Sequence, residues 1–212
     1  MATKTEAKTK KSNYDAFGTF TDKRDGKMYK TVKIGKQVWM AENLAYDTKD
    51  KGSKCYGEGT PIGCCIKKWS KAEIQANCEK YGRLYYWKTA KKACPKGWHI
   101  PSDKDWQALV KFAGGKEKAG KKLKAKDGWE DTSEGKSGNG TDDFGFAAMP
   151  GGIGYSSGEF SNIGDSGVWW LEEGLDLGIN NYSINSGVND TYTFCHNDDN
   201  SEYLFSIRCI KD

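Results

Sequence analysis

The sequence predicts an α+β domain with short antiparallel strands, two or three short helices and long loops, stapled by disulfides. Three observations favour this class. Residues 28–40 alternate between apolar and polar side chains, as in a β-hairpin. Residues 101–115 carry the start and stop signals of an amphipathic helix. The 212 residues include 26 glycines and seven cysteines, which is typical of a tightly turned, disulfide-stapled chain.

Length and composition bound the domain organisation. Residues 1–13 are charged and nearly devoid of apolar side chains, so we expect a disordered charged tail ahead of a single domain in residues 14–212. Hydrophobic residues make up only 36% of the chain, but it contains 8 Trp, 11 Tyr and 8 Phe. Because aromatic side chains bury large areas, they are expected to supply much of the core.

The charge pattern argues against nucleic-acid binding. The net charge is +4, and residues 1–11 contribute +3 of it through four lysines and one glutamate. A nucleic-acid binder usually presents a basic face with spaced aromatic residues, whereas the lysines here are scattered. No apolar run reaches the length of a membrane-spanning helix. We therefore expect neither a nucleic-acid partner nor a transmembrane segment.

The number and spacing of the cysteines indicate the cellular compartment of the protein. Seven exceed normal cytosolic usage, and none forms the C-x-x-C pair of zinc or thioredoxin-type sites. Disulfides persist in oxidising compartments, so we expect a secreted or cell-surface protein. Residues 1–4 lack the apolar core of a signal peptide, and we expect that signal to be absent from this sequence. The alternative is that the cysteines are reduced.

The first elements are a hairpin and a capped helix. In residues 28–40, apolar side chains flank a turn at Gly35 and Lys36, which predicts two paired strands. Residues 47–68 are rich in glycine and lysine and predict a stapled surface loop. Ser70 and Glu73 then form a capping-box pattern, which predicts a short helix through residue 81.

A second capped helix follows an extended segment. Residues 82–87 predict a strand, and residues 89–93 predict a short helical stretch. Pro101 stops the next strand, after which Ser102 and Asp105 can exchange reciprocal capping bonds. Apolar side chains then recur at helical spacing until two glycines end the helix. They are Trp106, Leu109, Val110 and Ala113.

The second half of the chain has fewer signals. Residues 119–124 predict one or two further helical turns. From residue 132 onward, long stretches of Gly, Asn, Ser and Asp separate short apolar runs, which predicts short strands between long loops. Asp142 and Asp143 are expected to cap a turn.

Six sequence blocks carry a resemblance to a known family. They are GKQVWMAENLAY (35–46), YGRLYYW (81–87), ACPKGWHIPS (93–102), GTDDFGF (140–146), GVWW (167–170) and FSIRC (205–209). In this order, the chain from about residue 25 to residue 212 resembles the Fibrobacter succinogenes major paralogous domain family. The resemblance implies a secreted or surface bacterial domain with a C-type-lectin-like fold, related to the formylglycine-generating enzymes. The chain departs from the family at Leu171 and Glu172, and the loop with Cys64 and Cys65 and the Ser70 helix look like an insertion.

The same resemblance implies a disulfide. By the lectin-like analogy, Cys94 pairs with Cys209 and ties a helix to the last strand. Closing a loop of this length contributes about 4–5 kcal/mol in the chain-entropy model. The alternative is two separate buried thiols.

Two further disulfides are expected. The second pair is Cys55 with Cys78. The third is Cys195 with either Cys64 or Cys65, and the choice between them stays open. Because seven is an odd number, one thiol remains free.

In a lectin-like fold the ligand-facing strands and loops fall in residues 167–200. Trp169 and Trp170 are candidates for an aromatic platform that stacks on sugar rings. Adjacent strand residues face opposite sides, so at most one can be exposed, and the alternative is that both are buried. Polar candidates for holding sugar hydroxyls follow, although the alternative is a solvated loop. They are Glu172, Asn181, Tyr182, Asn185, Asn189, Tyr192 and Asp198.

Calcium is the one cofactor for which ligands are suggested. Asp198, Asp199 and Asn200 supply the hard oxygen atoms that calcium prefers, although the spacing is not that of an EF-hand. No other cofactor is expected.

No catalytic constellation is recognised. Residues 164–167 match the GDSG motif of trypsin-like proteases, but the two histidines, His99 and His196, lack the required context. A formylglycine-generating oxidase needs two cysteine thiolates for copper, and only Cys209 has a suitable context. We therefore expect a binding or adhesion module for polysaccharide and not an enzyme. The alternative is a structural or protein-interaction module of a surface assembly, and the least favoured is an enzyme of the formylglycine-generating type.

Overall fold

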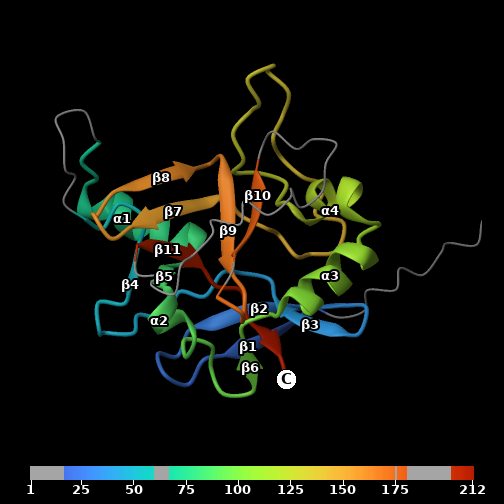
Figure 1. Ribbon diagram of the computed structural model, residues 1–212, viewed down its shortest axis with the longest axis horizontal. Helices are drawn as coiled ribbons and strands as arrows, with labels where there is room; N and C mark the ends of the chain where they lie inside the picture. The colour runs from blue at the N-terminus through green and yellow to red at the C-terminus, as the bar shows by residue number, and fades with distance from the viewer. Residues whose placement is uncertain (1–16, 60–66, 175, 181–201) are drawn as a thin grey trace, which may run out of the picture.

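The computed structural model describes residues 17–59, 67–174, 176–180 and 202–212, and it has the α+β architecture that the sequence predicts (Figure 1). One sheet has five antiparallel strands in the order β1-β2-β3-β12-β6. Its members are β1 (Phe17–Thr21), β2 (Met28–Ile34), β3 (Gln37–Met40), β12 (Ile210–Lys211) and β6 (Trp98–His99).

The second sheet follows the order β10-β9-β7-β11-β5-β4, with β8 beside β7. Its strands are short: β10 (Asp176–Asn180), β9 (Ser166–Trp170), β7 (Gly151–Tyr155), β11 (Tyr203–Ser206), β5 (Leu84–Tyr86), β4 (Ser53–Lys54) and β8 (Phe160–Ile163). Most pairs are antiparallel, as expected, but β9 also makes short parallel contacts with β7 and β11.

The predicted hairpin is confirmed as β2 and β3. Ile34 pairs with Gln37, which leaves a two-residue turn whose first residue, Gly35, has a φ of +61°. A type II′ turn requires a positive φ at this position, and glycine adopts it without strain. Both faces of the hairpin are covered: Val32 lies in one apolar cluster and Tyr29 in another.

Four helices are described, and each overlaps a segment that the sequence predicts to be helical: α1 (Lys71–Tyr81), α2 (Trp87–Ala90), α3 (Asp103–Phe112) and α4 (Lys116–Leu123). Both predicted capping boxes are confirmed. In α3, Ser102 Oγ accepts from Asp105 N, and the carboxylate of Asp105 accepts from Ser102 N. In α1, Ser70 and Glu73 make the same exchange.

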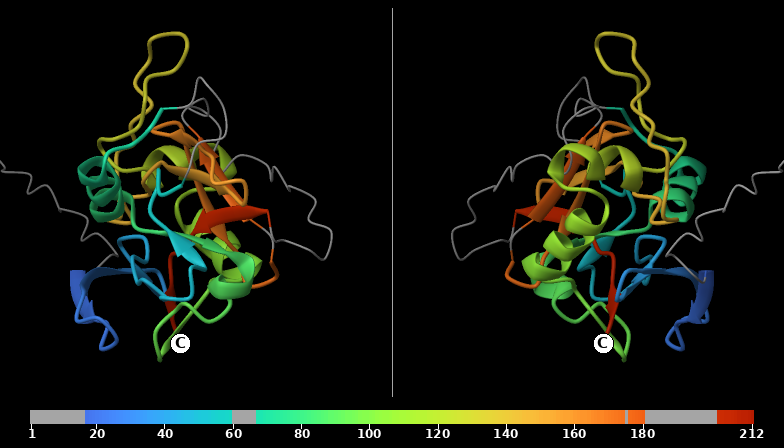
Figure 2. Two further views of the ribbon diagram at one scale, coloured as in Figure 1. Left: turned by 90° about the vertical axis from the view of Figure 1, so that its left-hand side faces the viewer. Right: turned by 90° about the vertical axis from the view of Figure 1, so that its right-hand side faces the viewer.

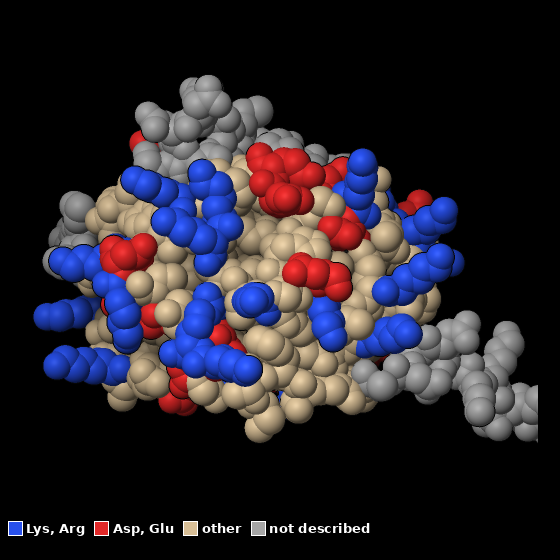
Figure 3. All heavy atoms as spheres, turned by 90° about the horizontal axis from the view of Figure 1, so that it is seen from below, with Lys and Arg blue, Asp and Glu red and all other residues tan. Residues whose placement is uncertain are grey.

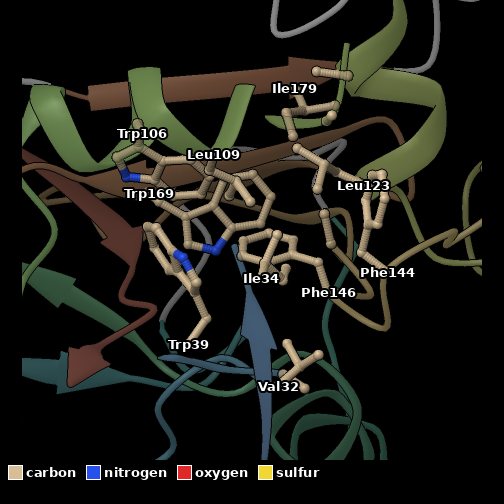
Figure 4. Packing of buried hydrophobic residues seen from close by; sticks show 14 of the residues in the cluster. Val32, Ile34, Trp39, Trp106, Leu109, Leu123, Phe144, Phe146, Trp169 and Ile179 are labelled. Carbon is tan, nitrogen blue, oxygen red and sulfur yellow. The ribbon is translucent and has the colours of Figure 1, made fainter. Parts of the chain in front are cut away.

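The largest core cluster joins the first sheet to α3, α4 and strand β9, and aromatic rings fill its centre (Figure 4). The ring centroid of Trp106 lies 5.0 Å from that of Trp39, 5.6 Å from that of Phe146 and 6.0 Å from that of Trp169. All four side chains are fully buried. Aromatic residues therefore supply much of this core, as their abundance predicts.

The two disulfides with a predicted single pairing are both confirmed. Cys94 is bonded to Cys209 across 115 residues, and Cys55 is bonded to Cys78 across 23 residues. The third predicted pair, of Cys195 with Cys64 or Cys65, lies outside the described residues.

The Cys55–Cys78 disulfide has a cation beside it. Arg83 Nη1 lies 3.4 Å from the sulfur of Cys55 and 3.7 Å from that of Cys78. The guanidinium is held there by ion pairs with Asp47 and Glu58 at 3.7 and 3.4 Å. A cation in this position stabilises a thiolate, which is the leaving group when the disulfide is reduced.

We therefore expect the Cys55–Cys78 disulfide to be reduced before the Cys94–Cys209 disulfide, because Arg83 stabilises the departing thiolate of the first pair while Cys209 lies in an apolar cluster. Graded dithiothreitol, alkylation and mass spectrometry would report the two midpoints separately. Arg83→Met should make the first pair harder to reduce and leave the second unchanged. Simultaneous reduction of both pairs, with or without Arg83, would contradict this prediction.

On the face seen from below in Figure 3, lysine and arginine side chains alternate with carboxylates, so no field of one sign covers it. Across the described ranges, no helix has both the length and the apolar character needed to cross a bilayer.

Candidate functional site: a groove between the first hairpin and helix α1

Neither predicted tryptophan offers a sugar-binding face. Trp169 and Trp170 point to opposite sides of β9, as strand alternation requires, but both are fully buried. Trp169 Nε1 donates to Asn43 Oδ1 at 2.8 Å, and Trp170 Nε1 donates to Tyr85 O at 2.6 Å. The platform hypothesis is wrong because β9 is an inner strand with a core cluster on each face.

The other predicted ligand residues are not brought together by the described structure. Glu172 has an exposed side chain, and its backbone N–H donates to Pro101 O. The remaining polar candidates and the calcium candidates lie outside the described residues: Asn181, Tyr182, Asn185, Asn189, Tyr192, Asp198, Asp199 and Asn200. The parts of the chain that are described contain no cluster of three or more acidic, His or Cys side chains suited to a metal ion.

The structure instead contains an open groove of about 440 Å³. Its walls come from the β1–β2 hairpin, the segment after β3, the end of α1 and the loop that precedes β7. Figure 2 shows the β1–β2 hairpin and α1 on the same side of the molecule, one above the other. The lining residues are Phe17, Lys27, Met28, Lys30, Ala41, Glu42, Asn43, Glu79, Lys80, Gly82, Asp142, Gly145, Ala147 and Met149.

A buried arginine lies behind the groove wall. Arg208 is fully buried, and its Nε and Nη2 donate to Oδ1 of Asn43 at 3.1 and 2.7 Å. Nη1 donates to Phe146 O, and Nη2 also donates to Ala147 O at 3.3 Å. The guanidinium carbon lies 4.6 Å from the Phe146 ring centroid. Its hydrogen-bond acceptors are thus amide and backbone oxygens, with no carboxylate among them in the described structure.

Arg208 remains protonated although it is buried. Burial lowers the pKa of Arg208 to about 9, and the carboxylates of Asp142 and Glu42 oppose this shift. The guanidinium is therefore still protonated at pH 7. It places a positive charge directly behind residues that line the groove.

The same arginine braces the strained wall of the groove. Asp142 and Ala147 have φ values of +44° and +50°, which side-chain-bearing residues rarely adopt. Asp142 Oδ1 accepts from Ala147 N at 2.8 Å, so the aspartate caps its own loop, as the sequence predicts. The bonds from Arg208 to the carbonyls of residues 146 and 147 hold the other side of the loop. Local capping and a buried donor together offset the strain.

Two apolar side chains are exposed at the groove. Phe17 is 71% exposed and Met28 is 61% exposed, although both are large and hydrophobic. The Phe17 ring lies against Gly145, where an added Cβ would collide with it. Glycine at 145 therefore serves two needs, a φ of +73° and the close approach of this ring.

Sequence reasoning missed this groove, although a signal for it was present. Four of the six family blocks, residues 35–46, 81–87, 140–146 and 205–209, converge on the groove wall and the arginine behind it. The exposed residues Phe17 and Met28 lie outside those blocks and carried no signal of their own.

A buried lysine adjoins the same wall. Lys124 O accepts from Asp142 N, and the Lys124 side chain is buried. Burial, with a smaller contribution from Lys121, lowers the pKa of Lys124 to about 8. Its ammonium lies 4.9 Å from the Trp129 ring centroid.

Because the pKa of Lys124 is lowered in the folded protein, we expect stability to depend on pH. Between pH 8 and 10.5 the unfolded chain binds more protons at Lys124 than the folded chain does, so the free energy of unfolding should rise with pH. Urea titrations between pH 7.5 and 9 should detect the rise in the wild type and a smaller one in Lys124→Met. Lys126→Met, which changes an exposed neighbour, is the control and should follow the wild type. Identical pH profiles for all three proteins would contradict the prediction.

Comparison with known proteins identifies the family. The model of the Fibrobacter succinogenes major domain matches residues 32–211, so the chain belongs to this family, as the six blocks predict. Neither the curated proteins nor the solved structures contain a match to the chain.

Proposed function

We propose that this domain is a secreted or cell-surface bacterial binding module that recognises polysaccharide through the groove. The observation that carries the proposal is Phe17, a ring that is 71% exposed and held in place at the groove by strand pairing and by Gly145. Carbohydrate sites combine a flat apolar face with hydrogen-bonding groups around it. Lysine and carboxylate side chains supply those groups here.

The proposal also includes a secreted or cell-surface location and a C-type-lectin-like fold, and one feature supports each. Two disulfides in the described residues suit an oxidising environment outside the cytoplasm. The pairing of Cys94 with Cys209 is the one that the C-type-lectin-like analogy implies. We propose a lectin-like fold on this ground, and no catalytic role.

A second candidate function rests on Met28. This exposed thioether and Phe17 both line the groove, and β1 is an edge strand. Methionine and aromatic residues are enriched at protein–protein interfaces. The domain would then be a structural or protein-interaction module of a surface assembly.

A glycan array and affinity electrophoresis in polysaccharide gels would test the first proposal. We expect the wild type to bind at least one polysaccharide and Phe17→Ala to weaken that binding about tenfold, or about 1.4 kcal/mol. Phe112→Ala is the matched control, because it removes a partly exposed ring outside the groove. Circular dichroism would verify that both variants are folded.

Each outcome separates the candidates. Absence of any polysaccharide binding above background would overturn the first proposal. Equal losses of binding in Phe17→Ala and Phe112→Ala would show that polysaccharide binding does not depend on the groove. Specific capture of one surface protein, lost in Met28→Ala, would favour the interaction module.

A further inference from the structure

The groove contains six charged side chains that are not paired with one another. Three are cationic and three are anionic: Lys27, Lys30, Lys80, Glu42, Glu79 and Asp142. In the part of the chain that the structure describes, the ion pairs all lie elsewhere. Side chains of opposite sign therefore share this groove without neutralising each other directly.

The three carboxylates already accept hydrogen bonds from the protein. Glu42 accepts from Lys30 N at 3.4 Å and Glu79 accepts from Gln75 Nε2 at 2.9 Å. Asp142 accepts from Ala147 N at 2.8 Å. Part of their acceptor capacity is thus committed to the fold, and Asp142 is fixed in its loop.

Within the described residues, the ammonium groups have no such commitment to an anion. Those of Lys27 and Lys80 lie over the rings of Tyr29 and Tyr81, at 5.3 and 5.0 Å from the centroids. The side chain of Lys30 is exposed on β2. An ammonium that lies over a ring or in water can turn toward a carboxylate at low cost, because its four-carbon stem is flexible.

The guanidinium of Arg208 adds a fourth positive charge behind the wall, and its hydrogen-bond acceptors in the described structure are amide and carbonyl oxygens. Four cations against three carboxylates give a net charge of +1 around the groove. The ammonium groups of the three lysines, which make no ion pair in the described structure, are therefore the donors available to an anionic ligand beside an exposed aromatic ring.

We infer that the groove selects an anionic polysaccharide, in which uronic acid carboxylates bind the ammonium groups of Lys27, Lys30 and Lys80 while a sugar face lies on Phe17. This inference rests on the proposed function. A uronic acid unit presents one carboxylate and one apolar face, which matches the two kinds of group exposed here. Because these ion pairs are near the surface, they are screened by salt and each contributes modestly.

The test compares a galacturonate oligosaccharide with its methyl ester, which has the same backbone without the charge. Calorimetry in the presence of EDTA excludes binding through calcium bridges. We expect the acid to bind at least tenfold more tightly than the ester at low salt, and the preference to vanish at high salt. Lys30→Met/Lys80→Met should weaken binding of the acid roughly fivefold, while Lys88→Met, on α2, should not.

The outcomes distinguish this inference from the proposed function. Equal binding of the acid and the ester would overturn the inference and leave polysaccharide binding in place. A preference for the acid that survives in Lys30→Met/Lys80→Met would overturn the assignment to this groove. Binding of neither compound, and of no neutral polysaccharide, would overturn both.

Discussion

Replacing Arg208 with methionine should lower the free energy of unfolding by about 3–5 kcal/mol. Methionine fills a similar volume, but it leaves Asn43 Oδ1 and the carbonyls of residues 146 and 147 without this donor. Removing the buried charge recovers its desolvation cost, which keeps the loss below the sum of the broken hydrogen bonds. Because two of those bonds brace a strained loop, the loss should also increase the mobility of residues 142–147.

Urea denaturation would measure the stability, and amide hydrogen exchange would measure the loop. Arg208→Lys keeps the charge, but its single ammonium lacks the planar fork with which arginine reaches three acceptors. We therefore expect this variant to lose nearly as much stability. Lys211→Met changes an exposed cation on β12 and should lie within about 0.5 kcal/mol of the wild type. If Arg208→Met were as stable as Lys211→Met, the network would have no structural role.

Removing the Cys94–Cys209 disulfide with alanines should lower the free energy of unfolding by about 5 kcal/mol, the largest effect we expect from a crosslink. In the chain-entropy model, a closed loop of 115 residues contributes about 5 kcal/mol and one of 23 residues about 3 kcal/mol. Cys209 also belongs to an apolar cluster that packs between the two sheets, so the crosslink fixes the segment between β11 and β12 to the segment between α2 and β6.

The Cys55→Ala/Cys78→Ala variant is the matched control, because it removes a shorter loop by the same chemistry. Thermal and urea unfolding under identical conditions should show a larger decrease in stability for the variant that lacks Cys94–Cys209 than for the one that lacks Cys55–Cys78. The reverse order would mean that the loop-length argument does not govern stability in this fold.

Sequence reasoning succeeded where a few neighbouring residues decide the outcome. Both capping boxes depend on hydrogen bonds over three residues, and the hairpin turn depends on one glycine. The Cys94–Cys209 pairing was implied by the family resemblance, and the structure confirms it. The capping boxes and the turn can be predicted because they do not depend on the rest of the tertiary structure, whereas the disulfide is a long-range contact that only the resemblance implied.

Sequence reasoning failed where burial depends on distant partners. The alternation of Trp169 and Trp170 was predicted correctly, but their exposure was not, because β9 lies between strands from other parts of the chain. The groove was missed for the same reason. It is assembled from four segments between residues 17 and 149, and no local pattern distinguishes the exposed Phe17 from a core phenylalanine.

Residues 203–211 have a consequence for how the chain reaches its native state. Within this segment β11 pairs with β5, β7 and β9 of one sheet, and β12 pairs with β3 and β6 of the other. Contacts so distant in sequence form slowly, and here they complete both sheets. A nascent chain on the ribosome therefore cannot complete either sheet until residue 211 has emerged.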